Sequence, residues 1–357
     1  MMSKSNIITG LDISSSKISA VMLELSGSGR STIIAHESQP SRGVNKGALT
    51  DIAEASRSVA NTLGRLREKT GRQPDNIYAN ISGDTIRGEK SKGMIPLSLR
   101  GREVTNSDIT RCMNAASTIR LAFDREVIHK IVLNFSIDDQ PSIKSAMGLY
   151  ASRLYCEMYV ITVNLNHVQN IYKCVNDAGF DLKEVVYSGI ADGLSVLEDT
   201  QKDEGVMLLS MGSSLTEISV FSGGVLTHLD VVTCGAKDIK GVIKESAEFN
   251  SITSRIKSAA EDLAKKGQII KSVVMTGSFT FLEGVADELE ECLALPVKMG
   301  IVKSIHGNIS GVESLRAVTA IGLARYGSIE YQPKAVQAKK FVRNISDKVV
   351  EIFNNYF

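Results

Sequence analysis

Three short polar turns hold the residues of this chain whose types and spacing suit phosphate chemistry. The turns lie in GLDISSSK from Gly10, in LLSMGSSLTE from Leu208 and in MTGSF from Met275. A tight turn directs backbone N–H groups at anionic oxygens, and glycine lets the backbone approach closely. Many nucleotide-binding proteins place Asp-Ile-Gly-Gly-Gly-Thr in such a turn. In the second turn of this chain, however, Ser210 stands where that motif has its acid.

Other reactive side chains show no pattern that indicates a site. The five histidines are His36, His129, His167, His228 and His306, and the five cysteines are Cys112, Cys156, Cys174, Cys234 and Cys292. None of them forms the pairs or short spacings that are typical of zinc ligands. Scattered cysteines in odd number indicate free, mostly buried thiols in a reducing cytoplasm.

Length and charge narrow the class of protein. A chain of 357 residues predicts two core-bearing units. With 41 basic and 40 acidic side chains, the chain lacks the basic surplus that nucleic-acid binders usually carry. Its first residues, MMSKSNIITGLDISSSK, have no long apolar run and so predict no signal peptide. No segment reaches the ~20 apolar residues of a membrane-spanning helix.

Alternating strands and helices predict an α/β protein with mixed sheets. Strands are expected at Ile7–Ile13 and Lys17–Leu25, and a second strand–turn–strand unit begins at Val206. This duplicated opening predicts two related core domains that face one another. The other expected elements are strands at Asn76–Ile81, Ile128–Ile137, Leu154–Val163 and Ser272–Met275 and helices at Asp51–Thr70, after a cap at Thr105 or Asn106, at Val168–Ala178 and at about Val285–Leu293.

The end of the chain predicts an amphipathic helix after a break at Pro333. Its apolar stripe is flanked by cations and carries several aromatic side chains, a combination that favours a membrane interface over docking on the body. The residues expected to meet the membrane are Lys339, Lys340, Phe341, Arg343, Ile345, Val349, Ile352, Phe353, Tyr356 and Phe357.

Taken in order, these segments resemble the bacterial cell-division actin homologue FtsA of the actin/Hsp70-like ATPase superfamily. SRGVNKGALTDI from Ser41 is similar to the most specific motif of that family, and GLDISSSK resembles its first phosphate turn. NISGDTIRGEKSKGMIPLS resembles the entry into an inserted domain, and DLKEVVYSGIADGLSVL resembles the return to the first core domain. The terminal helix resembles the membrane-targeting sequence of the family.

The resemblance implies an actin-like two-domain α/β fold with an inserted small α+β domain and a C-terminal amphipathic helix. It divides the chain into a first core domain at 1–82, with 158–200 and 318–331, and an inserted domain at 83–157. A reduced second core domain follows at 201–317, and a linker with the membrane helix at 332–357. One usual subdomain is missing or reduced, because about forty residues, mostly one helical stretch, separate Cys234 from Val273.

The resemblance also assigns roles in the phosphate turns, several of which are eroded. Asp12 matches the Mg-side acid and Lys17 the phosphate-side lysine, whereas Ser210, Leu215 and Phe279 depart from the pattern. Phe279 adds a side chain where a purine or ribose would approach. The candidate nucleotide-binding residues are Asp12, Ser15, Ser16, Lys17, Gly212, Ser213, Thr216 and Gly277, with Asp12 as the one candidate Mg ligand.

The leading hypothesis is therefore a non-enzymatic, membrane-associated cytoskeletal scaffold or filament with lost or weakened ATP binding. It would lie on the cytoplasmic face of the cell membrane, self-associate and contact cell-division proteins, with the tubulin-like FtsZ among the candidates and no nucleic acid. Two alternatives remain open. One is an actin-like protein that still binds ATP and Mg²⁺ and polymerises, and the other is a pilus-type actin-like platform.

Overall fold

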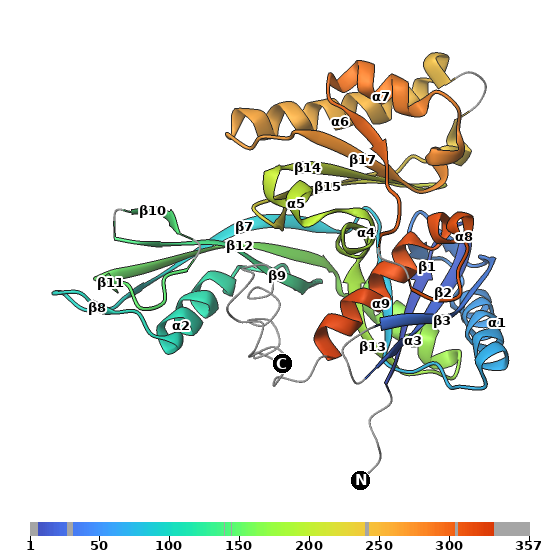
Figure 1. Cartoon of the computed structure of the whole chain (residues 1–357), viewed down its shortest axis with the longest axis horizontal. Coiled ribbons are helices and arrows are strands. Elements are labelled where there is room, and N and C mark those ends of the chain that lie inside the picture. The colour runs from blue at the N-terminus through green and yellow to red at the C-terminus, as the bar shows by residue number, and fades with distance from the viewer. Residues whose placement is uncertain are drawn as a thin grey trace, which may run out of the picture.

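The computed structural model describes residues 6–26, 31–138, 140–143, 145–239, 243–303 and 306–331. Two five-stranded sheets form two lobes, and a third sheet forms an arm that projects from them (Figure 1). The expected terminal helix and its ten membrane-facing residues lie outside the described residues, as does Pro333. Within the described part, no helix is both long and apolar enough to cross a membrane.

The first lobe is a sheet in the order β13-β6-β1-β2-β3, with helices on both faces. Its strands are β1 (Ile7–Ile13), β2 (Lys17–Leu25), β3 (Ser31–Pro40), β6 (Ile77–Ile81) and β13 (Leu182–Tyr187), beside the short pair β4 (Val44–Asn45) and β5 (Ala48–Leu49). Its helices are α1 (Ile52–Thr70), α3 (Leu165–Asp177), α4 (Ser188–Val196), α8 (Gly311–Arg316) and α9 (Val318–Tyr331). Helices α1 and α3 pack together on the sheet, and α9 lies along β1.

Close packing of α9 against β1 depends on a glycine. A Cβ atom on Gly10 would lie 2.0 Å from the carbonyl oxygen of Ala320. Because both backbones meet here, the first turn of α9 reaches the end of β1, where the candidate phosphate turn begins.

The second lobe repeats this plan in the order β16-β15-β14-β17-β18. Its elements are β14 (Val206–Met211), β15 (Thr216–Ser222), β16 (Val225–Val232), β17 (Ser272–Thr276), β18 (Val297–Met299), α5 (Asp199–Glu204), α6 (Ala247–Lys265), α7 (Val285–Leu293) and the 3₁₀ turns η1 (Ala236–Asp238), η2 (Ile243–Glu245) and η3 (Ser278–Phe281). In both lobes the first hairpin is antiparallel and its first strand then pairs in parallel with a later strand. The predicted duplication is confirmed.

The interval between β16 and β17 is short in this chain. Its described residues form η1, η2 and α6, and none of them is in a strand. Ile252 and Ile256 of α6 are buried in the core of the second lobe, where Ile239 and Ile243 are partly buried. The helix is therefore used to cover its own sheet, and the interval has no separate folded subdomain among the described residues.

The arm is a curved sheet in the order β10-β9-β12-β7, with α2 on one face. Its elements are β7 (Arg87–Pro96), β8 (Arg102–Glu103), α2 (Asn106–Ser117), β9 (Arg125–Ile137), β10 (Gln140–Ile143), β11 (Tyr150–Ala151) and β12 (Arg153–Asn164). Thr105 caps α2, as expected, in a reciprocal pair with Asp108, and Arg102 binds the Asp108 carboxylate with two contacts of 2.6 Å. The arm has its own core.

The two lobes share one hydrophobic core. A single cluster of buried side chains contains Leu11 and Ala79 of the first sheet together with Leu208 and Val274 of the second. A buried hydrogen bond between the Tyr187 and Ser219 hydroxyls (3.1 Å) joins the two lobes, and another from the Leu229 N–H to the Tyr159 hydroxyl (2.8 Å) joins the second lobe to the arm. These contacts fix how the three polar turns face one another.

Candidate functional site

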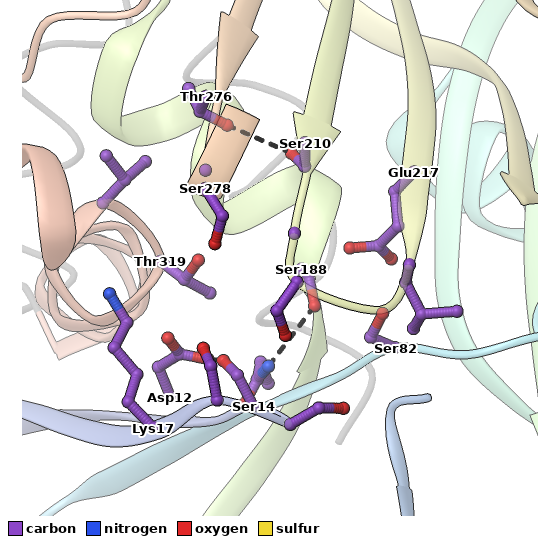
Figure 2. A pocket seen from close by; sticks show the side chains of 18 of the residues that line it. Asp12, Ser14, Lys17, Ser82, Ser188, Ser210, Glu217, Thr276, Ser278 and Thr319 are labelled. Atoms are coloured by element: carbon purple, nitrogen blue, oxygen red, sulfur yellow. Dashed lines mark hydrogen bonds between the residues drawn. The ribbon is translucent and has the colours of Figure 1, made fainter. Parts of the chain in front are cut away.

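A cavity of about 390 Å³ lies where the three predicted turns meet. Side chains from both lobes point into it, with Asp12, Ser14 and Lys17 on one side and Ser210, Glu217 and Ser278 on the other (Figure 2). Seven of the eight candidate binding residues line this cavity: Asp12, Ser15, Ser16, Lys17, Gly212, Ser213 and Gly277. Thr216 is buried elsewhere, and its hydroxyl donates to the carbonyl of Cys234 (3.0 Å).

The first turn places a carboxyl group and an ammonium group in the cleft. Asp12 is 4% exposed and accepts a hydrogen bond from the Ser14 hydroxyl, while the Lys17 ammonium donates to the carbonyl of Arg316. Burial raises the pKa of Asp12, and the nearby Lys17 opposes that shift. Burial likewise lowers the pKa of Lys17, and Asp12 opposes it. The two groups therefore stabilise one another's charged forms.

The second turn keeps the backbone geometry without the acid. The Gly212 N–H bonds to the Leu215 carbonyl (2.8 Å) and closes the turn. The carbonyls of Gly212 and Ser213 accept from Ala236 (3.0 Å) and Lys237 (2.9 Å), which hold the turn from behind. Among the described residues, nothing accepts from the N–H groups of Ser213 and Ser214 or from those of Ser15 and Ser16. Both turns thus leave N–H donors for an anion.

Glu217 is a buried carboxyl group with an unsatisfied atom. It pairs with Ser210 across the hairpin and is 5% exposed, and its Oε1 has no hydrogen-bond partner among the described residues. Burial raises its pKa to about 8, with a further contribution from Asp192, while a hydrogen bond from Ser82 opposes the shift. At neutral pH Glu217 is therefore mostly protonated and uncharged.

Asp192 is a site residue that the sequence did not reveal. It lies in α4, is 3% exposed, and accepts hydrogen bonds from the hydroxyls of Ser210 and Thr319, the latter at 2.7 Å. Burial raises its pKa to about 6, and the two hydroxyl donors oppose the shift. The sequence did contain one signal for it, a single acid within the small and apolar segment SGIADGLSV. An acid in such a segment becomes buried, and a buried acid needs hydrogen-bond partners.

The third turn corrects one expectation. Gly277 has φ 91°, and a Cβ atom there would lie 2.5 Å from the carbonyl oxygen of Met211, so glycine is required. Phe279, which the sequence placed beside a purine or ribose, is instead fully buried in the second core, with its ring 6.3 Å from that of Phe249. The aromatic side chain that lines the cleft is Phe281, which is 53% exposed and lies 5.7 Å from the Arg316 guanidinium.

Comparison with known proteins shows similarity to one group of cell-division proteins. A family model described as the SHS2 domain inserted in FTSA matches residues 83–162, the arm and its junction. The cell division protein FtsA of Pseudomonas aeruginosa is 26% identical over 373 residues, which cover 90% of this chain and 89% of that protein. FtsA of Borreliella burgdorferi is 27% identical over 376 residues, with 90% and 91% covered. Over about nine-tenths of its length the chain is thus similar to the FtsA proteins, and its arm matches the SHS2 domain inserted in FtsA.

A solved structure agrees on the fold. The PilM-PilN type IV pilus biogenesis complex has a chain with TM-score 0.66 and 14% identity, and the match covers 91% of this chain and 99% of that one. At that identity the likeness concerns the fold alone. The architecture is the actin-like two-domain α/β fold with the SHS2 domain of FtsA inserted.

The cleft of this FtsA relative fits phosphates and a hydrated cation in part. The free N–H donors, the close approach at Gly277 and the unpartnered Oε1 of Glu217 all leave room for a polar ligand. Among the described residues, no group of three or more His, Cys, Asp or Glu side chains could hold a metal directly. Mg²⁺ keeps several waters in its sites, so two carboxylates suffice to hold it through those waters.

Proposed function

We propose that this protein is a membrane-associated, non-enzymatic scaffold of bacterial cell division. The observation that carries the proposal is the SHS2 match at residues 83–162 within an actin-like body, in a chain whose relatives are named cell division protein FtsA. The self-association and division-protein contacts expected of such a scaffold, FtsZ among them, are part of the proposal. The reduced interval between β16 and β17 makes any FtsZ contact different from one that uses a full subdomain.

Weak nucleotide binding is the second part of the proposal. Compared with the first turn, the second has Ser210 in place of an acid and Leu215 in place of a lysine. The one ammonium of the cavity, Lys17, is already bonded to a carbonyl. Each missing charge-assisted contact costs about 1.5–3 kcal/mol, so ATP is expected to bind orders of magnitude more weakly than to an intact clamp.

The same geometry argues against hydrolysis. Phosphoryl transfer depends on a positioned metal and on a residue that orients the attacking water. Glu217 is the carboxyl group of the second hairpin that faces the cavity, and it is mostly protonated at neutral pH because burial raises its pKa to about 8. A protonated carboxylic acid does not accept the proton of a water. If bound nucleotide is present, it serves as a structural ligand.

Membrane attachment is assigned to the terminal segment 339–357. Its support is the sequence pattern of one apolar stripe with Lys339, Lys340, Arg343 and Lys348 beside it. Each cation near an anionic leaflet contributes about 1 kcal/mol, and one such helix binds reversibly. Self-association of the body would multiply this weak contact by avidity and keep the protein on the cytoplasmic face of the membrane.

Sedimentation with vesicles that contain one-third anionic lipid tests the attachment. We expect the full chain to sediment and Ile352→Glu, which places a charge in the apolar stripe, to remain in solution. Asn354→Glu adds the same charge outside the stripe and should sediment like the wild type. Equal sedimentation of full-length chain and a chain ending at Tyr331 would disprove the attachment. A fluorescent fusion should gather at mid-cell, and ATP turnover above the protein-free rate would disprove the non-enzymatic assignment.

A further inference from the structure

We propose that Asp192 takes over, from the first lobe, the cation-facing place of the acid that the second hairpin lacks. A hydrated divalent cation with a nucleoside polyphosphate would then meet two carboxylates, Asp12 and Asp192, that both belong to the first lobe. The inference rests on the proposed function, because it explains how the same weakened cleft still holds such a ligand.

The position of Asp192 supports the exchange. Its carboxylate accepts from the hydroxyl of Ser210, the residue that occupies the acid position at the end of β14. The acid and the hydroxyl therefore form one hydrogen-bonded pair across the cleft, with the acid on α4 instead of on β14. A second donor, Thr319 of α9 at 2.7 Å, fixes the carboxylate from its own lobe. Asp192, Ser210 and Thr319 all line the cavity.

The charged groups that line the cavity suit the proposed role of Asp192. Asp12, Lys17 and Asp192 influence one another electrostatically, so they share one part of the cleft. The cavity is lined by these two carboxylates and by two cations, Lys17 and Arg316. A polyphosphate that brings its own divalent cation would place negative charge beside the cations and positive charge beside the carboxylates.

The exchange also changes what a ligand does to the lobes. A cation bound by one acid from each lobe would draw the lobes together, whereas here the two acids, Asp192 and Asp12, come from α4 and β1 of one lobe. The lobes are joined instead by their own contacts, among them the Ser210–Asp192 and Tyr187–Ser219 hydrogen bonds. The cation itself would therefore not link an acid of one lobe to an acid of the other, while the phosphates still meet N–H donors of both turns.

Calorimetric titration of the full chain with ATP in excess Mg²⁺ at pH 7.5, repeated in EDTA, tests the assignment. We expect Mg²⁺-dependent binding to the wild type and a loss of affinity of at least about tenfold for Asp192→Asn. The double variant Asp192→Ser/Ser210→Asp, which returns the acid to β14, should recover most of the affinity. Asp192→Glu should recover part of it. Asp199→Asn, an exposed acid on the next helix, is the matched control and should bind like the wild type.

Each outcome decides the inference. Unchanged binding in Asp192→Asn, or no rescue by the exchange variant, overturns it. If Asp192→Asn does not fold, the exchange variant decides alone, because its hydrogen-bonded pair is preserved. If the wild type shows no Mg²⁺-dependent binding, this inference falls while the scaffold function stands. Failure of vesicle sedimentation has the opposite meaning, since it overturns the attachment and leaves Asp192 untouched.

Discussion

The first hairpins of the two lobes share one backbone plan but differ in their chemistry. Their last paired residues are Ile13 and Ile18 in one lobe and Met211 and Thr216 in the other, and four turn residues follow in each. In both, the first turn residue donates its N–H to the carbonyl of the fourth. The two hairpins therefore align residue for residue without a gap.

The polar side chains at aligned positions of the two hairpins differ. Asp12 pairs with Ser19 in the first hairpin, whereas Ser210 pairs with Glu217 in the second. The fourth turn residue is Lys17 in one and Leu215 in the other, and Leu215 is buried. A backbone that directs N–H groups at an anion can thus persist while its charges move, and the charge of the second site now comes from α4.

The largest effect on stability is expected at a position where the two lobes differ in how closely a helix packs on the sheet. The first strand of the first lobe has Gly10, pressed on α9, where that of the second lobe has Leu208. Gly10→Ala should lower the free energy of unfolding by about 3 kcal/mol, because its methyl group meets the backbone of α9. Gly64→Ala in α1, where nothing lies within 4 Å, should raise it by up to about 1 kcal/mol. Urea unfolding measures both, and equal stabilities would contradict the packing.

Glu217, the acid of the second hairpin, predicts that the stability of the fold depends on pH. Burial raises the pKa of Glu217 to about 8, above its value in the unfolded chain, so the folded state binds a proton that the unfolded state releases. Stability from this group is complete at acidic pH and is lost as the pH rises through 8. Between pH 6 and 8 the loss should be about 2 kcal/mol.

Glu217→Gln removes this dependence, because the amide does not titrate. Between pH 6 and pH 8 the free energy of unfolding of this variant should fall by about 2 kcal/mol less than that of the wild type. Glu290→Gln on the exposed face of α7 is the control and should keep the slope of the wild type. A wild-type slope in Glu217→Gln would show that another group titrates in this range.

The smallest effect is expected at the edge of the cleft. Phe281 is half-exposed and offers a face on which a base can stack, at about 1 kcal/mol or more. Phe281→Ala should weaken ATP about fivefold and leave the affinity for tripolyphosphate unchanged, as two calorimetric titrations would show. Equal losses for the two ligands would mean that the ring supports the turn and not the base.

The helices and strands could be predicted from the sequence because each depends on the local spacing of residue types. Strand alternation predicted both hairpins, and the Thr105–Asp108 pair predicted the start of α2. Asp192 could not be predicted as a site residue, because it meets Ser210 only through the packing of α4 between the sheets. Thr216 was misplaced because neighbours in a strand point to opposite faces, so only one of Thr216 and Glu217 reaches the cavity. The η3 turn likewise buries Phe279 and exposes Phe281.

Small-angle X-ray scattering tests most directly whether the bound cation draws the two lobes together. The sample is a chain ending at Tyr331, at a concentration of Mg²⁺ and ATP that calorimetry shows to be saturating. We expect the same radius of gyration with and without ligand. A contraction is expected only in Asp192→Ser/Ser210→Asp, where the acid is back on the second lobe. A ligand-induced contraction of the wild type would contradict the account.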